Sequence, residues 1–97
     1  MKKISWEMGE FSGVKTKLMH ENSAAKEILI AMSKGAVLAD HAAPNEISVQ
    51  VLKGSVKFGI GDEICELKPI EMVTVEAKVT HFVQANEDTI IRLSLAK

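Results

Sequence analysis

The sequence has few aromatic residues and no tyrosine. Among its 97 residues there are three Phe and one Trp, so Val, Ile, Leu and Met must fill most of any core. Hydrophobic residues make up 46% of the chain, which is enough to build one core. The length is typical of a single domain, and we expect residues 1–97 to form one domain.

Cysteine is almost absent: Cys65 is the only one, which excludes an internal disulfide. It lies between Ile64 and Glu66 in a strand-like run, and no Lys, Arg or His stands beside it to favour its thiolate form. We therefore predict that Cys65 is a small buried hydrophobic residue rather than a reactive thiol. A single cysteine is compatible with a reducing compartment.

Long apolar runs and concentrated basic segments are also missing. No apolar stretch approaches the ~20 residues of a membrane-spanning helix, and the start, MKKISWEMGE, lacks the apolar segment of a signal peptide. We expect a soluble cytoplasmic protein with no membrane partner. The formal net charge is −1 and the lysines are spread along the chain, which argues against a nucleic-acid partner because phosphate binding needs a concentrated basic face.

The segments that are present are short, rich in Val and Ile, and separated by turn residues, a pattern that predicts an all-β fold. Residues 26–34 fit a helix or a strand by length, but their β-branched residues and the Gly35 that follows favour a strand. Gly61 and Asp62 predict a tight hairpin. We expect about nine strands and no helix, over residues 13–21, 26–34, 35–41, 46–52, 55–60, 64–67, 72–77, 80–85 and 89–96.

Residues 46–52 show the cleanest alternation in the chain. Every second side chain of a strand lies on the same face. The two faces of this strand consist of Ile47, Val49 and Val51 on one side and Glu46, Ser48, Gln50 and Leu52 on the other. Because the first set is wholly apolar, we predict that it faces the core and that Glu46 points away from it.

From Gly35 onward, the order of turns and histidines is distinctive. A glycine and a histidine separated by five residues are followed by VLKG, GDE, LKP, another histidine and ANED. In this order, the features are Gly35 and His41, Val51–Gly54, Gly61–Glu63, Leu67–Pro69, His81 and Ala85–Asp88. The order resembles a small single-domain cupin of the RmlC-like type, over roughly the C-terminal two thirds of the chain. The resemblance implies an all-β, cupin-type β-barrel, which is a double-stranded β-helix or jelly roll.

The resemblance also implies a metal-ligand set. In cupins a His-x-His pair, a Glu or Gln and a later His point into the barrel and hold a divalent metal. His41 matches the first of these positions and His81 the last. The second histidine position is Ala43, and the Glu or Gln position falls on Ile47, with Glu46 one residue away. A shift by one residue reverses the face of a strand, so Glu46 becomes a ligand only if a bulge shifts the register.

The second half of the pattern departs from the family as well. The Gly-Asp pair that cupins carry before the last motif is Ile70-Glu71 here, and the Pro five residues before the histidine is Glu76. Together with Ala43 and Ile47, these differences leave a degenerate metal motif in which only His41 and His81 remain.

Two functions follow from the resemblance, and a structural or interaction role with a filled barrel is a third possibility. The first is a small-molecule-binding cupin whose metal-ligand set is incomplete. Its pocket holds a small organic ligand and is lined by Ile47, Val49 and Val51 at the floor and by His41 and His81 at the polar mouth. The alternative is a metal-dependent cupin enzyme of the oxygenase or isomerase type. The ligand count separates the two, because a catalytic metal usually takes three protein ligands.

The sequence assigns no catalytic residue and no cofactor, apart from a weakly bound divalent transition metal at His41 and His81. Cupins of this size often pair, and the N-terminal strands offer an edge that would otherwise stay open. We therefore expect a homodimer.

Overall fold

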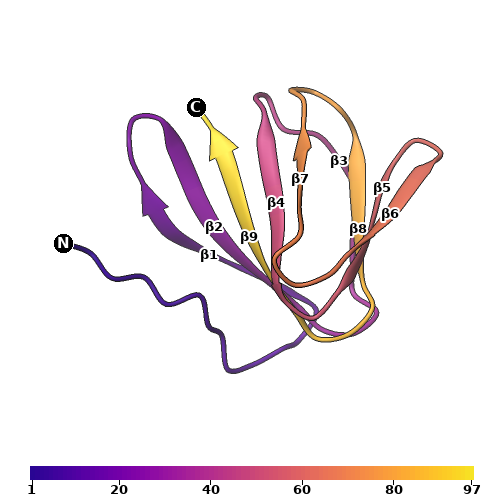
Figure 1. The fold of residues 1–97 in the computed structure, drawn as a ribbon, viewed down its shortest axis with the longest axis horizontal. Coiled ribbons are helices and arrows are strands. Elements are labelled where there is room, and N and C mark those ends of the chain that lie inside the picture. Colours follow the sequence, from indigo (N-terminus) through magenta and orange to yellow (C-terminus); the bar gives the residue numbers. More distant parts are fainter.

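The structure is all-β, as the short alternating segments predict. The computed structural model describes residues 1–97 and contains nine strands and no helix (Figure 1). Every expected strand is present, with small differences at the ends, and the segment that also fitted a helix forms a strand. The strands are β1 Val14–Glu21, β2 Ala25–Met32, β3 Val37–His41, β4 Ile47–Lys53, β5 Val56–Ile60, β6 Glu63–Leu67, β7 Met72–Val75, β8 His81–Ala85 and β9 Thr89–Ala96.

The strands form two antiparallel sheets. The larger sheet has the order β1-β2-β9-β4-β7, and the smaller has the order β3-β8-β5-β6. From β2 onward the chain passes repeatedly from one sheet to the other, so strands that follow each other in sequence lie mostly in different sheets (Figure 1). This arrangement is a jelly roll, which confirms the predicted fold class.

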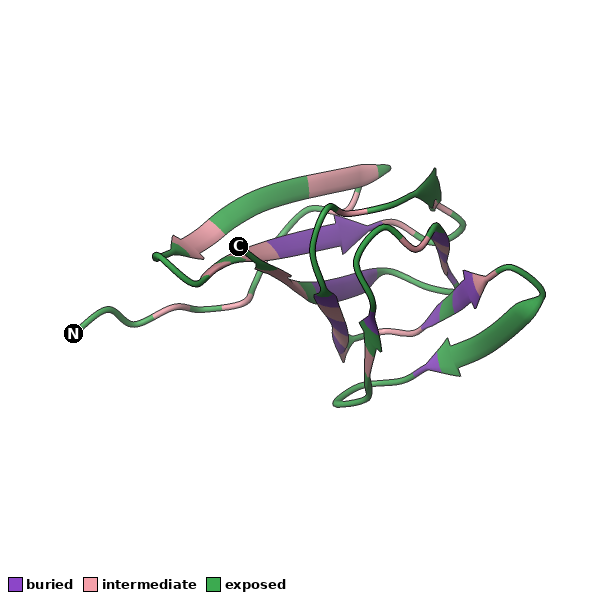
Figure 2. Ribbon diagram, turned by 90° about the horizontal axis from the view of Figure 1, so that it is seen from above, coloured by how far each residue is buried: buried purple, intermediate pink, exposed green.

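One apolar core fills the space between the sheets. Figure 2 shows buried segments on the facing strands of both sheets and exposed residues along the edges. Fully burying an aliphatic side chain stabilises a fold by roughly 1.5–3 kcal/mol. The core consists of twelve buried side chains, which are Ile30, Met32, Ile47, Val49, Val51, Val56, Phe58, Leu67, Val75, Val83, Ala85 and Ile91.

The alternation of β4 is confirmed. Ile47 is 4% exposed and lies in the core with Val49 and Val51, whereas Glu46 is exposed. Pairing with β9 runs without interruption from Ile47 to Val51, and its one register shift comes later, between Val51 and Lys53. No bulge therefore turns Glu46 inward.

A second, smaller cluster lies on the outer face of the larger sheet. Leu29, Ala31 and Ile90 are buried there. The N-terminal segment, which has no regular secondary structure, covers them with Trp6, Met8 and Phe11. Two of the chain's four aromatic residues outside the histidines are thus used on this outer face rather than between the sheets.

The prediction that Cys65 is buried is wrong: its side chain is exposed. Cys65 lies opposite Phe58 in the β5–β6 pair and therefore shares its inward face. β6, however, is an edge strand of the smaller sheet, and its hairpin projects away from the rest of the molecule (Figure 2). β7 of the larger sheet approaches this end of the inward face, but a small cavity lies between its residues Val73 and Thr74 and Cys65, so the alternation is kept but the burial is not.

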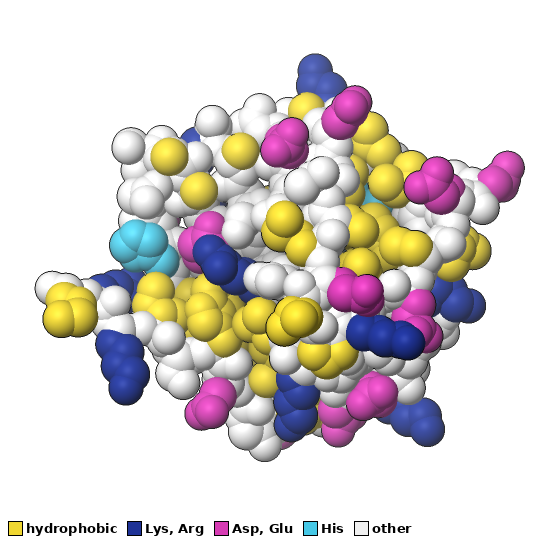
Figure 3. All heavy atoms as spheres, in the orientation of Figure 1, with side chains coloured by type: hydrophobic (Ala, Val, Ile, Leu, Met, Phe, Trp, Pro, Cys, Tyr) yellow, Lys and Arg dark blue, Asp and Glu magenta, His cyan; other side chains and the backbone are white.

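The surface mixes charges of both signs. On the face shown in Figure 3, basic and acidic side chains are interspersed around a central band of hydrophobic side chains. No helix in the structure is long and apolar enough to cross a membrane.

One turn holds a side chain in an unfavourable backbone conformation. Ile70 has a φ of 71°, a region that β-branched residues avoid. Its N–H donates to the Val51 carbonyl at 2.8 Å, and its side chain is 83% exposed. The turn therefore imposes this conformation without packing the side chain. Ile70 stands where the cupin pattern has glycine, the residue that adopts this conformation without strain.

The register of β4 predicts opposite responses at two adjacent residues. Ile47→Ala should lower the free energy of unfolding by about 2–5 kcal/mol, because it leaves a cavity in the core. Glu46→Gln should change it by no more than about 0.5 kcal/mol, because Glu46 is on the surface. Urea denaturation of the two variants measures both values. A mild Ile47→Ala together with a severe Glu46→Gln would mean that the strand faces the other way.

The strain at Ile70 predicts a stabilising substitution. Ile70→Gly should raise the free energy of unfolding by about 0.5–1 kcal/mol, because relief of the left-handed conformation exceeds the extra entropy of glycine in the unfolded chain. Ile64→Gly is the matched control, since Ile64 is also exposed but lies in an extended strand. It should be destabilising, and thermal or urea denaturation compares the two. Equal losses at both positions would contradict the strain at Ile70.

Candidate functional site

The structure brings His41 and His81 together. His41 ends β3 and His81 begins β8, and the two residues lie opposite each other in the antiparallel pair. Their ring centroids are 4.3 Å apart with a tilt of 58°. His81 is 3% exposed and stacks on Phe58, with 5.6 Å between centroids, while His41 is exposed. The pair therefore joins a buried ring to a solvent-facing ring.

Hydrogen bonds assign the tautomers of both rings. Nδ1 of His41 lies 3.1 Å from the Ala39 carbonyl oxygen, and Nδ1 of His81 lies 3.1 Å from that of Val79. A carbonyl only accepts, so each Nδ1 carries the hydrogen, and Nε2 of the neutral ring keeps its lone pair. Metal-binding histidines are commonly oriented by such a second bond. Each ring thus presents one nitrogen that accepts a hydrogen bond or binds a cation.

The environment of His81 favours its neutral form. Burial lowers the pKa of this imidazole below its ordinary value of 6.5. The hydrogen bond to the Val79 carbonyl opposes this effect, and the charge of His41 adds to it. The buried ring is therefore mostly neutral at pH 7 and keeps its Nε2 lone pair there.

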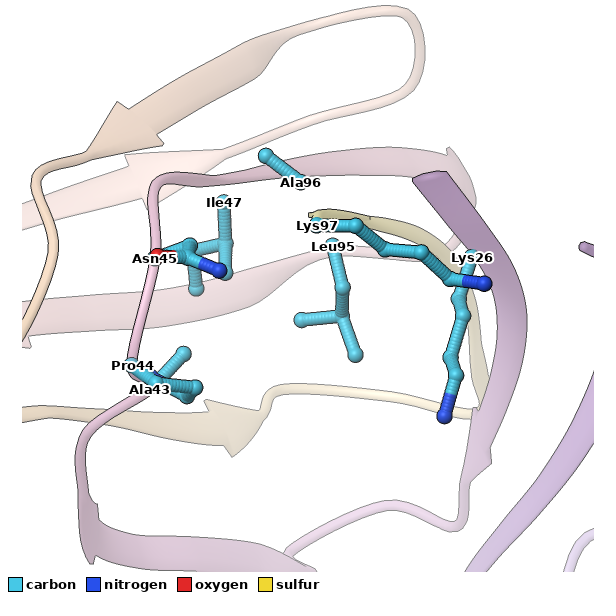
Figure 4. A pocket seen from close by; sticks show the side chains of 8 residues that line it. All are labelled: Lys26, Ala43, Pro44, Asn45, Ile47, Leu95, Ala96 and Lys97. Carbon is cyan, nitrogen blue, oxygen red and sulfur yellow. The ribbon is translucent and has the colours of Figure 1, made fainter. Parts of the chain in front are cut away.

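A cavity of about 230 Å³ lies at the end of the larger sheet, next to the turn between β3 and β4. Ala43, Pro44 and Asn45 of this turn line one side of it (Figure 4). Ile47 and Leu95, which are directly opposite each other in the β4–β9 pair, lie between this turn and the far side. The cavity is therefore apolar at its floor.

Lys26 and Lys97 line the far side of the cavity (Figure 4). The lining contains no acidic residue. The nearest ion pair joins Lys97 Nζ to Glu21 Oε2 at 2.5 Å. This hydrogen bond and the charge of Lys97, followed by the charge of Lys26, hold the pKa of the Glu21 carboxyl below its ordinary value of 4.5. Two positive charges and one negative charge thus meet at this corner.

The predicted pocket residues do not line one pocket. They lie at the cavity, in the packed core and in the histidine pair. Ile47 lines the cavity, as does Ala43. Val49 and Val51 belong to the packed core, because side chains of both sheets fill the space over them. His41 and His81 line none of the cavities in the structure. Their assignment as metal ligands or as a pocket mouth stays a prediction.

Sequence reasoning missed the lysines and Asn45. A signal for Lys26 was present, because Lys26, Ile28, Ile30 and Met32 alternate along one face of β2. Ile30 and Met32 are in the core, so the same face places Lys26 beside the cavity at the end of the strand, where its side chain is exposed. No comparable signal marks Lys97 or Asn45, because their positions depend on how β9 and the β3–β4 turn meet in three dimensions.

Solved structures show which fold this is. No protein-family model and no curated protein matches the chain. An RmlC-like cupin protein from Desulfovibrio desulfuricans is 22% identical, with a TM-score of 0.88 over 99% of this chain and 96% of that one. A cupin superfamily protein from Desulfitobacterium hafniense is 12% identical, with a TM-score of 0.85 over 93% and 83%. An RmlC-like cupin from Shewanella frigidimarina is 19% identical, with a TM-score of 0.81 over 97% and 84%. The chain therefore has the cupin fold.

The low pKa of His81 predicts how stability depends on pH. The ring takes up a proton at a higher pH in the unfolded chain than in the folded one, so the unfolded state binds more protons as pH falls below 6.5. Unfolding free energy should therefore be lower at about pH 5.5 than at about pH 7.5, and His81→Gln should reduce this loss. Urea denaturation at both pH values measures it. An NMR titration midpoint for His81 at or above 6.5 would contradict the prediction.

Proposed function

We propose that this chain binds a small organic molecule in the cavity at the end of its barrel, in place of a complete metal centre. The proposal rests chiefly on the lining of that cavity. Ala43 and Ile47 stand where the cupin pattern has a histidine and a Glu or Gln, and both line the 230 Å³ cavity. At these two positions, side chains that would bind a metal are replaced by side chains that bind apolar surface. Ligand pockets typically combine such a surface with a few polar groups.

The residues present do not fit a catalytic metal. His41 and His81 offer one Nε2 lone pair each. No group of three or more His, Cys, Asp or Glu side chains is placed to hold a metal ion. Because catalytic sites usually provide three protein ligands, two imidazoles are too few, and a divalent transition metal would be held weakly.

One observation favours the alternative, a metal-dependent cupin enzyme of the oxygenase or isomerase type. Both histidines bond their Nδ1–H to a backbone carbonyl and are held next to each other, which is the orientation of metal-binding histidines. This arrangement supplies two ligands, and the enzyme would need a third from outside the chain's own side chains.

A homodimer remains part of the proposal. β1 is an edge strand of the larger sheet, so one side of its backbone has no strand partner within the chain. Edge strands are the positions at which sheets extend by pairing. A second copy of the chain pairing along β1 would cover this edge.

Restoring the missing ligands separates the two functions. We expect the unmodified chain to bind Zn²⁺ weakly, and the double variant Ala43→His with Ile47→Glu to bind it at least about 100-fold more tightly, because four ligands replace two. Competition with a chromogenic chelator measures the affinity. Without metal the double variant should be less stable, since Ile47→Glu buries a carboxylate.

The matched control is Ala42→His with Ile47→Glu. Ala42 is the exposed neighbour of Ala43 and does not line the cavity, so this variant should gain far less Zn²⁺ affinity. A stoichiometric metal that stays on the unmodified chain during dialysis against a chelator would favour the enzyme. Equal gains in both double variants would show that Ala43 does not occupy the ligand position.

A further inference from the structure

We propose that the cavity takes a small organic anion, with a carboxylate bound by Lys26 and an apolar body lying on Ile47 and Leu95. This assignment rests on the proposed function and adds the chemical class of the ligand. It follows from the orientation of Lys26, from the balance of charge around it, and from the size and chemistry of the lining.

Lys26 belongs to the inward face of the larger sheet. Directly paired residues of neighbouring strands share a face, and Lys26 is paired with Leu95, which is paired with Ile47. These three residues form a row that runs from Lys26, across Leu95 in the cavity floor, to Ile47 in the core. Lys26 stands at the end of β2, where its side chain is exposed and water reaches its ammonium group. Lys26 takes part in none of the chain's four ion pairs, so its charge remains available to a ligand.

The charge around the cavity is positive. Lys97 forms an ion pair with Glu21, and Lys26, which lies directly opposite Glu21 in the β1–β2 pair, adds a second positive charge near that carboxylate. Glu46 follows Asn45 in sequence but is exposed and does not line the cavity. Two lysines line the cavity and Glu21 is the carboxylate beside them, so one positive charge is left over, which attracts an anion and repels a cation.

The end of β9 is held firmly at this corner. The N–H of Ala96 donates to the Glu46 carbonyl at 3.1 Å, and the N–H of Lys97 donates to the Ala24 carbonyl at 2.9 Å. These bonds connect the end of β9 to β4 on one side and to the β1–β2 turn on the other. The backbone at Lys97 and the apolar floor are therefore positioned before any ligand arrives, which lowers the entropy cost of binding.

The volume and lining limit the ligand further. A cavity of about 230 Å³ is larger than the roughly 150 Å³ cavity that binds a benzene ring, so it has room for a small organic molecule. Inorganic phosphate would leave the surface of Ile47, Leu95 and Pro44 without apolar contact. A neutral hydrocarbon would leave Lys26 unpaired. A monocarboxylate with a compact apolar tail satisfies both parts, and the Asn45 amide offers a further hydrogen bond.

Matched acid and amide probes test the assignment. Benzoate is compared with benzamide, and hexanoate with hexanamide, because each pair differs in charge but hardly in shape. The full chain is titrated with each compound, and NMR follows the methyl groups of Ile47 and Leu95 and the side-chain amide of Asn45. We expect each acid to bind at least about tenfold more tightly than its amide, because a charge-assisted hydrogen bond replaces a neutral one.

Lys26→Met keeps the aliphatic stem of the lysine but removes its charge. It should weaken binding of the acids about tenfold and leave binding of the amides unchanged. Lys17→Met is the matched control, since Lys17 is exposed on β1, forms no ion pair and does not line the cavity. It should affect neither series.

The possible results test the anion assignment and the proposed small-molecule binding separately. If acids and amides shift the cavity signals with equal affinity, and Lys26→Met changes neither, the anion assignment is overturned while small-molecule binding in the cavity stands. If no compound of either series shifts the signals of Ile47, Leu95 or Asn45 at millimolar concentration, both are overturned.

Discussion

The pairing of β4 between β9 and β7 determines which side chains reach the inside of this barrel. In that register Ile47, Val49 and Val51 face the core and Glu46 faces solvent. A shift by one residue would expose three apolar side chains, each stabilising the fold by roughly 1.5–3 kcal/mol, and would turn the Glu46 carboxylate toward the core. The apolar character of the metal-ligand position, and the cavity next to it, both follow from this register.

Much of the fold is readable from the sequence because strands repeat every two residues. β4 was predicted correctly from the alternation of Ile47, Val49 and Val51, and β2 from its β-branched residues despite a length that also suits a helix. Cys65 shows where alternation stops being informative. It defines the face of a side chain, but burial also requires close packing of a second layer against that face, and at the edge strand β6 a small cavity separates Cys65 from β7.

The functional site was harder to predict than the strands, because it also depends on contacts between segments that are far apart in the sequence. The approach of His41 to His81 could be expected from the cupin pattern, and the structure brings the rings to 4.3 Å. The cavity could not be expected, because it depends on how the β3–β4 turn closes against the end of β9, and no local sequence signal describes that contact. At Ile70, by contrast, the cupin pattern predicts the backbone but not the residue. The side chain differs from the glycine of the pattern, yet the backbone keeps the left-handed conformation.

Two chemically different features therefore lie at this end of the barrel. One is a pair of imidazoles whose Nε2 atoms are free to bind, and the other is an apolar cavity lined in part by the exposed Lys26. A crystal structure of the chain grown with equimolar Zn²⁺ and excess benzoate tests directly which of them binds. The account predicts benzoate in the cavity, with its ring on Ile47 and its carboxylate on Lys26. Zinc at full occupancy, held by His41, His81 and a third protein side chain while the cavity contains no benzoate, would contradict it.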